Sequence, residues 1–190
     1  MKGKTQNPLK GILFFTTAIF LISVVDTICK LFTKDLHSIQ LVWGYFVGIN
    51  LMLWIFFFLK GEKLSKLRAT DRPFLQIVRP AFVVCSISSL FVGLTYLPIA
   101  EVTAIGFVAP LFITALSVPI LKETVDIHRW SAVVIGLIGV IIIVRPGGDF
   151  WHFASIMPLL GALFFALFQI MTRLLSVTEN TYTTLFYTGL

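Results

Sequence analysis

Residues 97–121 read LPIAEVTAIGFVAPLFITALSVPIL, a long apolar stretch whose only charged residue is Glu101. A helix needs about 20 mostly apolar residues to cross the hydrocarbon core of a bilayer. We therefore expect one membrane-spanning helix over Ala100–Leu121. The Leu97-Pro98 dipeptide before it predicts a very tight turn, because proline cannot continue the preceding helix.

Five other segments have the same apolar character. They are Gly11–Cys29, Ile39–Leu59, Phe74–Tyr96, Trp130–Val144 and Ala154–Thr172, and a further apolar run begins near Tyr182. The segment Trp130–Val144 is short and would cover only about 22 Å at 1.5 Å per residue, so it needs anchors at the membrane interfaces. The pattern predicts an all-α polytopic membrane protein.

The composition indicates a lipid environment. Hydrophobic residues make up 57% of the 190 residues and charged residues only 13%, against about 25% charged in soluble domains. The mean hydropathy is +0.95. The net charge of +6 comes from basic residues between apolar runs, where they set membrane orientation. The lipid bilayer is therefore the expected partner, and nucleic acid is not.

The lysine and arginine positions predict the orientation, since cytoplasmic connections carry an excess of these residues. With the N-terminus in the cytoplasm, twelve of the 15 fall on or near that side: Lys2, Lys4, Lys10, Lys60, Lys63, Lys66, Arg68, Arg72, Arg79, Lys122, Arg129 and Arg173. Only Lys30, Lys34 and Arg145 fall outside. We expect a cytoplasmic N-terminus in a bacterial inner (plasma) membrane.

A weak internal repeat relates the first and sixth segments. Residues 26–31 read DTICKL and residues 169–174 read QIMTRL. Chance similarity between apolar helices is one explanation. The other is a five-helix repeat, whose odd number of helices makes the second copy enter the membrane from the opposite side, as in many secondary transporters.

The first segment has a polar face, made of Thr16, Ser23, Asp26, Thr27 and Lys30. Ionisable residues within a span are costly and commonly functional. Asp26 is therefore a candidate carboxylate that faces a solvated cavity and binds a cationic group or a coupling proton. The alternative is an ion pair with Lys30, four residues later, at the interface.

Glu101 begins the fourth segment at a depth similar to that of Asp26 and on the same side of the membrane. The two carboxylates could form one acidic outer mouth. Alternatively, Glu101 only complements the helix dipole in the first turn.

Small and hydroxyl residues lie about one turn apart along the fourth segment: Thr103, Gly106, Pro110, Thr114 and Ser117. Pro110 leaves a backbone carbonyl without its donor about one turn earlier. The neighbouring residues could satisfy that group or contact a substrate. Close helix packing is the alternative, and it is favoured for Gly106.

Two further stripes predict tight helix interfaces. The third segment presents Ser86, Ser89, Gly93 and Tyr96, and the sixth presents Ala162, Ala166, Gln169 and Arg173. Tyr96 and Gln169 are the members best suited to a cavity. Ala132 and Gly136 in the fifth segment form a small-xxx-small packing contact.

Two large side chains with polar groups, Trp43 and Arg79, lie within the second and third apolar segments. Trp43 is either a cavity residue or a member of an aromatic belt near the interface. Arg79, near the cytoplasmic end of its segment, is expected to reach the interface by snorkelling.

Signatures of enzymes and metal sites are absent from the sequence. It contains no H-E-x-x-H, G-x-S-x-G or Walker-type motif. Cys29 and Cys85 match no metal or redox spacing, and His37, His128 and His152 lie in different loops. We therefore predict no enzyme activity, no cofactor and no metal.

Residues 97–112, LPIAEVTAIGFVAPLF, resemble the fourth-helix signature of EamA-type members of the drug/metabolite transporter superfamily. The resemblance continues through residues 121–123 (LKE), 129–130 (RW), 136–140 (GLIGV) and 144–147 (VRPG). It covers residues 8–147 as one full domain, and residues 154–190 resemble the opening of a second. Within the family, the chain is somewhat similar to bacterial S-adenosylmethionine uptake carriers.

This resemblance implies ten helices in two inverted five-helix repeats, with both termini cytoplasmic, and transport of small metabolites without ATP hydrolysis. The expected organisation is a cytoplasmic N-terminus (1–10), one five-helix repeat (11–147) and the truncated start of a second (154–190). The chain would then be a fragment of a ten-helix carrier, or a half-transporter that needs a homodimer. Many members carry an arginine where this chain has Gly44, so no anion-binding role is expected there.

The function we expect is secondary transport of a small polar or cationic metabolite by alternating access, with proton coupling as one option. The residues expected along the substrate pathway are Asp26, Trp43, Glu101, Thr103, Phe107, Pro110 and Gln169. The alternative is a non-transporting membrane scaffold, whose polar stripes would be buried in helix contacts.

Overall fold

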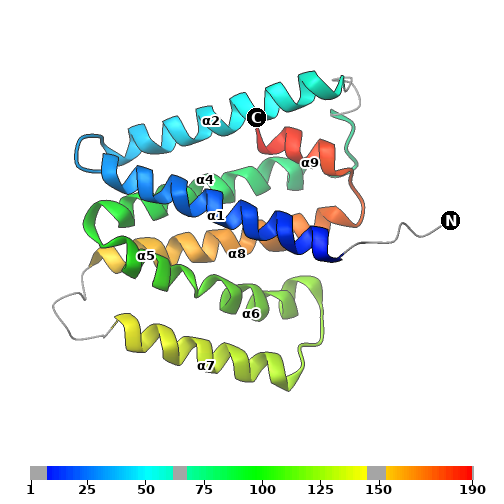
Figure 1. Ribbon diagram of the computed structural model, residues 1–190. Coiled ribbons are helices and arrows are strands. Elements are labelled where there is room, and N and C mark those ends of the chain that lie inside the picture. The colour runs from blue at the N-terminus through cyan, green and yellow to red at the C-terminus, as the bar shows by residue number, and fades with distance from the viewer. Residues whose placement is uncertain (1–7, 62–67, 145–152, 190) are drawn as a thin grey trace.

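The computed structural model of the chain describes residues 8–61, 68–144 and 153–189. All regular secondary structure within these ranges is helical (Figure 1). The elements are α1 (Pro8–Phe32), α2 (Ser38–Lys60), α4 (Pro73–Tyr96), α5 (Ile99–Gly106), α6 (Ala109–Leu121), α7 (Ile127–Val144), the short 3₁₀ helix η1 (Phe153–Ser155), α8 (Ile156–Ser176) and α9 (Thr181–Thr188). The predicted all-α class is confirmed.

Five stretches of the described chain are long and apolar enough to cross a membrane. They are Gly11–Phe32, Ser38–Lys60, Pro73–Tyr96, Ile99–Leu121 and Ile156–Ser176. The predicted fifth segment, Trp130–Val144, begins three residues later than the observed helix, since α7 begins at Ile127 and contains 18 residues. At 1.5 Å per residue α7 is about 27 Å long, close to the thickness of a bilayer core.

Successive long helices run in alternating directions, and the order places α1 and α8 antiparallel. In Figure 1, α1 starts at the right-hand end of the bundle, whereas α8 starts at the left-hand end. Four crossings (α2, α4, α5 with α6, and α7) lie between the two helices, so α8 comes five crossings after α1, an odd offset as a five-helix repeat requires.

The core lies where α4 meets α8. A Cβ atom added to Gly93 would come within 2.9 Å of the Pro158 ring, and one added to Gly161 would come within 3.1 Å of the Ser86 carbonyl oxygen. The Ser86 hydroxyl also donates a 2.8 Å hydrogen bond to the Gly161 carbonyl. Small residues on both helices thus allow close backbone approach, as the two stripes predicted.

The predicted single fourth helix is broken into α5 and α6, with a turn at Phe107 and Val108. Pro110 causes the break, because it has no N–H to donate to the carbonyl of Gly106. The Val108 amide bonds to the Ile105 carbonyl at 2.9 Å instead. Before α5, Leu97 has an extended backbone, so the tight turn predicted at Leu97-Pro98 is present.

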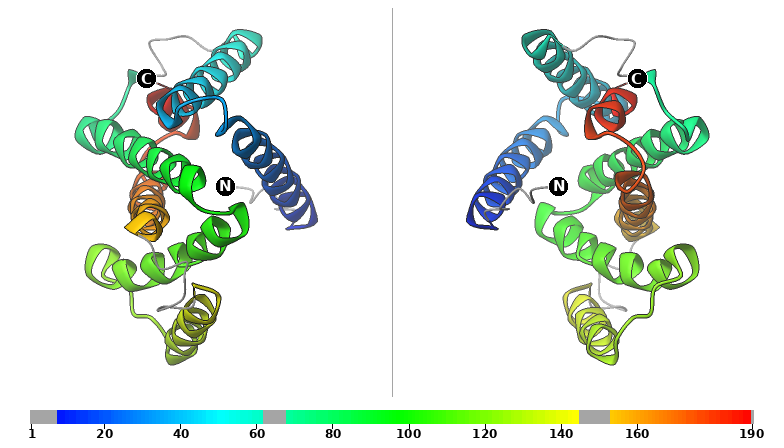
Figure 2. Two further views of the ribbon diagram at one scale, coloured as in Figure 1. Left: turned by 90° about the vertical axis from the view of Figure 1, so that its left-hand side faces the viewer. Right: turned by 90° about the vertical axis from the view of Figure 1, so that its right-hand side faces the viewer.

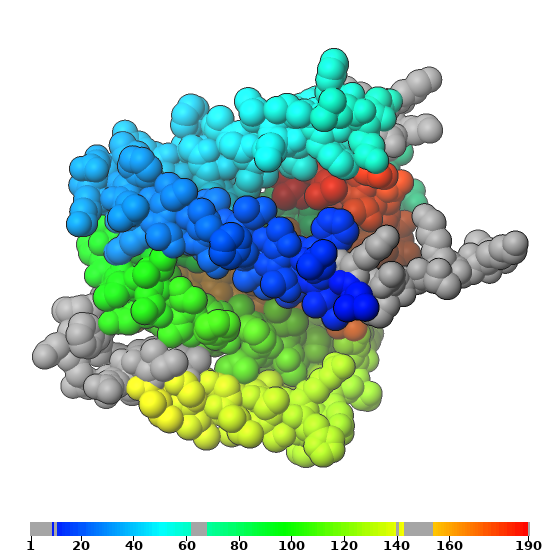
Figure 3. Space-filling model, viewed as in Figure 1, coloured from blue at the N-terminus to red at the C-terminus, as the bar shows by residue number. Residues whose placement is uncertain are grey.

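Helix α1 lies on the flank of the bundle away from α8 in both views of Figure 2. In Figure 3, α1 and α2 cover the upper front of the molecule, and α7 forms a separate ridge below. No residue in the most apolar window of α1 is buried. This helix therefore contributes little to the core, apart from contacts near its C-terminal end.

Candidate functional site

A cavity of about 250 Å³ opens between α1, α4 and α5. It is lined by Asp26 of α1, Leu90 and Leu94 of α4, Ile99, Val102, Thr103 and Gly106 of α5, and Phe107. Its volume is slightly below the range of about 300–1,000 Å³ that is typical of small-molecule sites. Three of the residues expected along a substrate pathway, Asp26, Thr103 and Phe107, therefore lie at one cavity.

Asp26 is the charged group of this cavity. Within the described residues its carboxylate forms no ion pair and accepts no hydrogen bond. Lys30, the partner that the sequence offered, donates instead to the carbonyl of Leu97 at 2.8 Å and to that of Leu94. A cation is favourable at the C-terminal end of α4, where carbonyls lack helical donors, so the alternative of an Asp26–Lys30 ion pair is wrong.

The break between α5 and α6 supplies a second polar group at the cavity. In the described part of the chain, no donor reaches the Gly106 carbonyl. The hydroxyls of Thr103 and Thr114 donate to the carbonyls of Ile99 (2.7 Å) and Pro110 (2.9 Å). Gly106 therefore keeps a free acceptor, and irregular backbone at membrane depth is tolerated where it lines a cavity.

The other expected pathway residues lie elsewhere. Glu101 occupies the first turn of α5, at the same end as Asp26, but does not line the cavity. Trp43 is 70% exposed on the outer face of α2. Pro110 and Gln169 are also exposed and are not among the lining residues.

A larger groove of about 840 Å³ lies along α2 beside α1 and is almost wholly apolar. Its lining includes Gly44 and Gly48, where an added Cβ would meet nothing within 4 Å, and Tyr45. None of the described residues that line the groove is charged, so the smaller cavity, which contains Asp26, is the candidate site.

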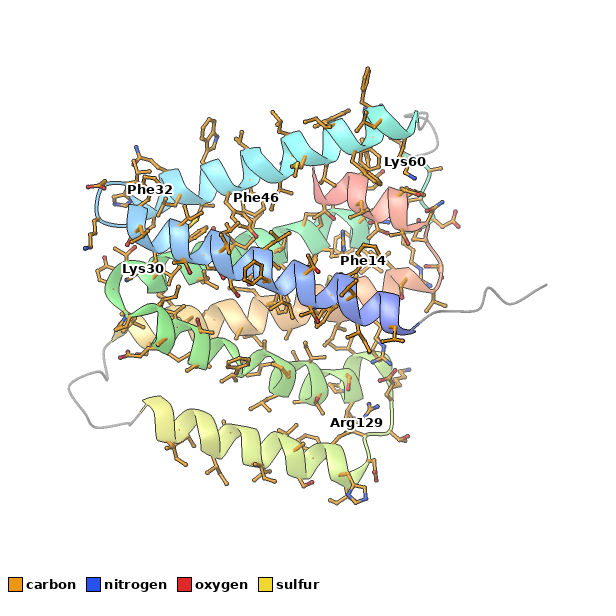
Figure 4. The ribbon with its side chains drawn as sticks, in the orientation of Figure 1. Phe14, Lys30, Phe32, Phe46, Lys60 and Arg129 are labelled. Carbon is orange, nitrogen blue, oxygen red and sulfur yellow. The ribbon has the colours of Figure 1, made fainter. Side chains whose placement is uncertain are left out.

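Charged side chains separate toward the two ends of the bundle. Figure 4 places Lys30 at one end and Lys60 and Arg129 at the other. The described cations at the second end, which we call the cation-rich end, are Lys60, Arg68, Arg72, Arg79, Lys122, Arg129 and Arg173. Lys2, Lys4, Lys63, Lys66 and Arg145 lie outside the described residues, as does the side chain of Lys10. The Asp26 cavity lies toward the opposite end.

Arg79 is buried, with 3% of its surface exposed, so the expected snorkelling is wrong. Its guanidinium donates to Thr172 of α8 at 3.0 Å and to the Thr184 carbonyl of α9 at 2.7 Å. Gln76, three residues earlier on the same face of α4, is fully buried beside it. This polar i, i+3 pair was the available sequence signal for an internal network.

The long apolar helices, which run in alternating directions, define a polytopic helical membrane protein. Residues 9–145 match the model of the EamA-like transporter family. The chain belongs to this family, as the fourth-helix signature indicated, and it is not an enzyme.

Known relatives are transporters of different compounds. The chain is 29% identical over 190 residues to the S-adenosylmethionine uptake transporter of Rickettsia prowazekii. This alignment covers all of the chain and 64% of the relative. The chain is 28% identical over 187 residues to the riboflavin transporter of Vibrio cholerae, covering 96% and 61%. It is 22% identical over 178 residues to a pseudopaline exporter of Pseudomonas aeruginosa, covering 93% and 61%. The chain thus spans slightly less than two thirds of these proteins, and no solved structure matches it.

Proposed function

We propose that the chain belongs to a secondary transporter that moves a small polar or cationic metabolite across the bacterial inner membrane by alternating access. The observation that carries this proposal is the Asp26 carboxylate, which has no partner among the described residues and lies at a cavity lined by Thr103 and Gly106. A charge in a membrane span is costly, so an unpaired one suggests a ligand or a proton as its partner.

The orientation we propose has the cation-rich end in the cytoplasm, following the positive-inside rule. The Asp26 cavity would then face the outside. Asp26 would attract the cationic group of a substrate or carry a coupling proton, and Thr103 and the free Gly106 carbonyl would add neutral hydrogen-bonding groups. Phe107 would close the cavity on its apolar side.

The substrates named for the relatives are the first compounds to test. S-adenosylmethionine carries a sulfonium cation, which a carboxylate can stabilise, whereas riboflavin is uncharged. We expect transport of S-adenosylmethionine to depend more strongly on Asp26 than transport of riboflavin, because an uncharged ligand gains less binding energy from a carboxylate.

The test is transport into proteoliposomes by the Asp26→Asn variant. Asp35→Asn is the matched control, because Asp35 is exposed in the α1–α2 connection at the same end. Hydrogen bonds to charged groups contribute about 1.5–3 kcal/mol, so Asp26→Asn should lower transport roughly tenfold or more. Asp35→Asn should leave it unchanged. If Asp26→Asn and Glu101→Gln both leave transport and its pH dependence unaltered, an acidic substrate entrance is refuted.

The alternative of a scaffold, or of a half-transporter completed by a homodimer, accounts for the small-residue stripes of α4 and α8. A scaffold does not account for the Asp26 carboxylate, which has no ion-pair partner in the part of the chain that the structure describes. A dry interface would leave that charge without compensation. A homodimer remains compatible with the cavity and changes only which chain supplies its remaining walls.

A further inference from the structure

We propose that Arg79 is a positioning residue that holds the cation-rich end of the bundle closed, by binding α4 to α8 and α9. This inference rests on the proposed alternating-access function. The first repeat contributes α4, whereas α8 and α9 follow it, so every bond of this network joins the two parts that must separate when this end opens.

The guanidinium of Arg79 reaches both partner helices. From α8 it meets the Thr172 hydroxyl at 3.0 Å and the Phe168 ring, whose centroid lies 5.0 Å from Cζ. From α9 it meets the Thr184 carbonyl at 2.7 Å and the Thr188 hydroxyl. We call this set of contacts the Arg79 latch.

All acceptors in the Arg79 latch are neutral. Within the described residues, no carboxylate pairs with this arginine, and its Nε atom and the Oε1 atom of Gln76 have no hydrogen-bond partner. A buried ion recovers hydration when it returns to water. The latch is therefore reversible: neutral hydrogen bonds hold it, and hydration of Arg79 favours its release. A carboxylate partner would shift this balance toward the closed form.

Other polar contacts between the same two parts gather at this end. The Glu179 carboxylate accepts from the Thr70 hydroxyl at 2.8 Å and from the Asp71 amide at 3.0 Å. Arg173 pairs with Glu123 through two contacts, of 2.8 and 3.0 Å. The Asp26 cavity lies toward the other end, so the structure has the arrangement of a carrier closed at the cation-rich end.

Hydrogen–deuterium exchange of the protein in lipid nanodiscs tests the latch without any substrate. Arg79→Gln should make the amides of α9 exchange about tenfold faster, because their protection requires the closed end. Thr172→Asp places a carboxylate beside the guanidinium and should slow the same amides by a similar factor. Arg72→Gln is the control, because Arg72 is exposed at the same end and has no side-chain contact with the latch.

A reciprocal readout separates a latch from a merely structural role. In a background with Cys29 and Cys85 replaced, Thr103→Cys reports access to the opposite end through its reaction with a membrane-impermeant thiol reagent. Arg79→Gln should slow its labelling and Thr172→Asp should speed it, because opening one end closes the other.

Three results would overturn the latch: exchange in α9 unaffected by Arg79→Gln, faster exchange spread evenly into α6 and α7, or labelling at Thr103 that changes in the same direction in both variants. Because neither readout needs transport, a protein that moves no tested compound would contradict the proposed function and leave the latch measurable.

Discussion

The contact between Gly93 and Pro158 lets the packing of α4 on α8 be tested by a single methyl group. In Gly93→Ala the new Cβ would lie 2.9 Å from Cδ and 3.4 Å from Cγ of the Pro158 ring. A proline ring cannot rotate away, so α4 and α8 must move apart. Overpacking of this kind costs about 1–3 kcal/mol.

The matched control is Gly44→Ala, where the new methyl group meets nothing within 4 Å. Both substitutions gain the same helix propensity of up to about 1 kcal/mol, so the difference between them isolates the clash. We expect Gly93→Ala to be less stable than Gly44→Ala by about 1–3 kcal/mol, or roughly 5- to 150-fold in the unfolding equilibrium.

The assay is reversible unfolding by sodium dodecyl sulfate in lipid bicelles, followed by circular dichroism. Adding Pro158→Ala should restore most of the stability lost in Gly93→Ala, because it removes the atoms that the methyl group meets. Equal unfolding free energies for Gly93→Ala and Gly44→Ala, within about 0.5 kcal/mol, would refute this account of the core.

Two further outcomes follow from the broken span and the exposed ion pair. Pro110→Ala supplies an N–H for the Gly106 carbonyl, so it should raise the unfolding free energy by about 1 kcal/mol while lowering transport in proteoliposomes; normal transport would show that the break has no role in the pathway. Arg173→Gln removes the pair with Glu123, whose side chains are 56% and 34% exposed, and should cost at most about 1 kcal/mol in bicelles; a larger loss would mean that this contact is integral to the core.

The sequence predicts the spans well, because hydropathy and helix length depend on local composition alone. The order of the helices, the tight turn at Leu97-Pro98 and the small-residue interfaces all follow from patterns within single segments. The sequence indicates that Pro110 frees a backbone carbonyl. It does not predict the full break after Gly106, because no pattern within the segment indicates how far a proline disrupts its helix.

Tertiary partners are what the sequence does not predict. The sequence places Asp26 one helical turn before Lys30, but the Lys30 ammonium binds carbonyls at the end of α4 instead. Arg79 was expected to reach the interface and is buried against α8 and α9. In both cases a long side chain has several partners within reach, and the packing of helices distant in sequence selects among them. The same packing brings Asp26, Thr103 and Phe107 to one cavity and leaves Trp43 and Gln169 outside it.

The proposed pathway requires the cavity between α1, α4 and α5 to contain water and to be connected to the non-cytoplasmic side. Labelling of Thr103→Cys by a membrane-impermeant thiol reagent, in intact cells and in a background without Cys29 and Cys85, measures this most directly. We expect rapid labelling from outside, slowed by a transported compound. A cysteine that reacts only after the membrane is opened, or not at all, would place Thr103 on the cytoplasmic side or in a dry helix contact and would contradict the proposed pathway.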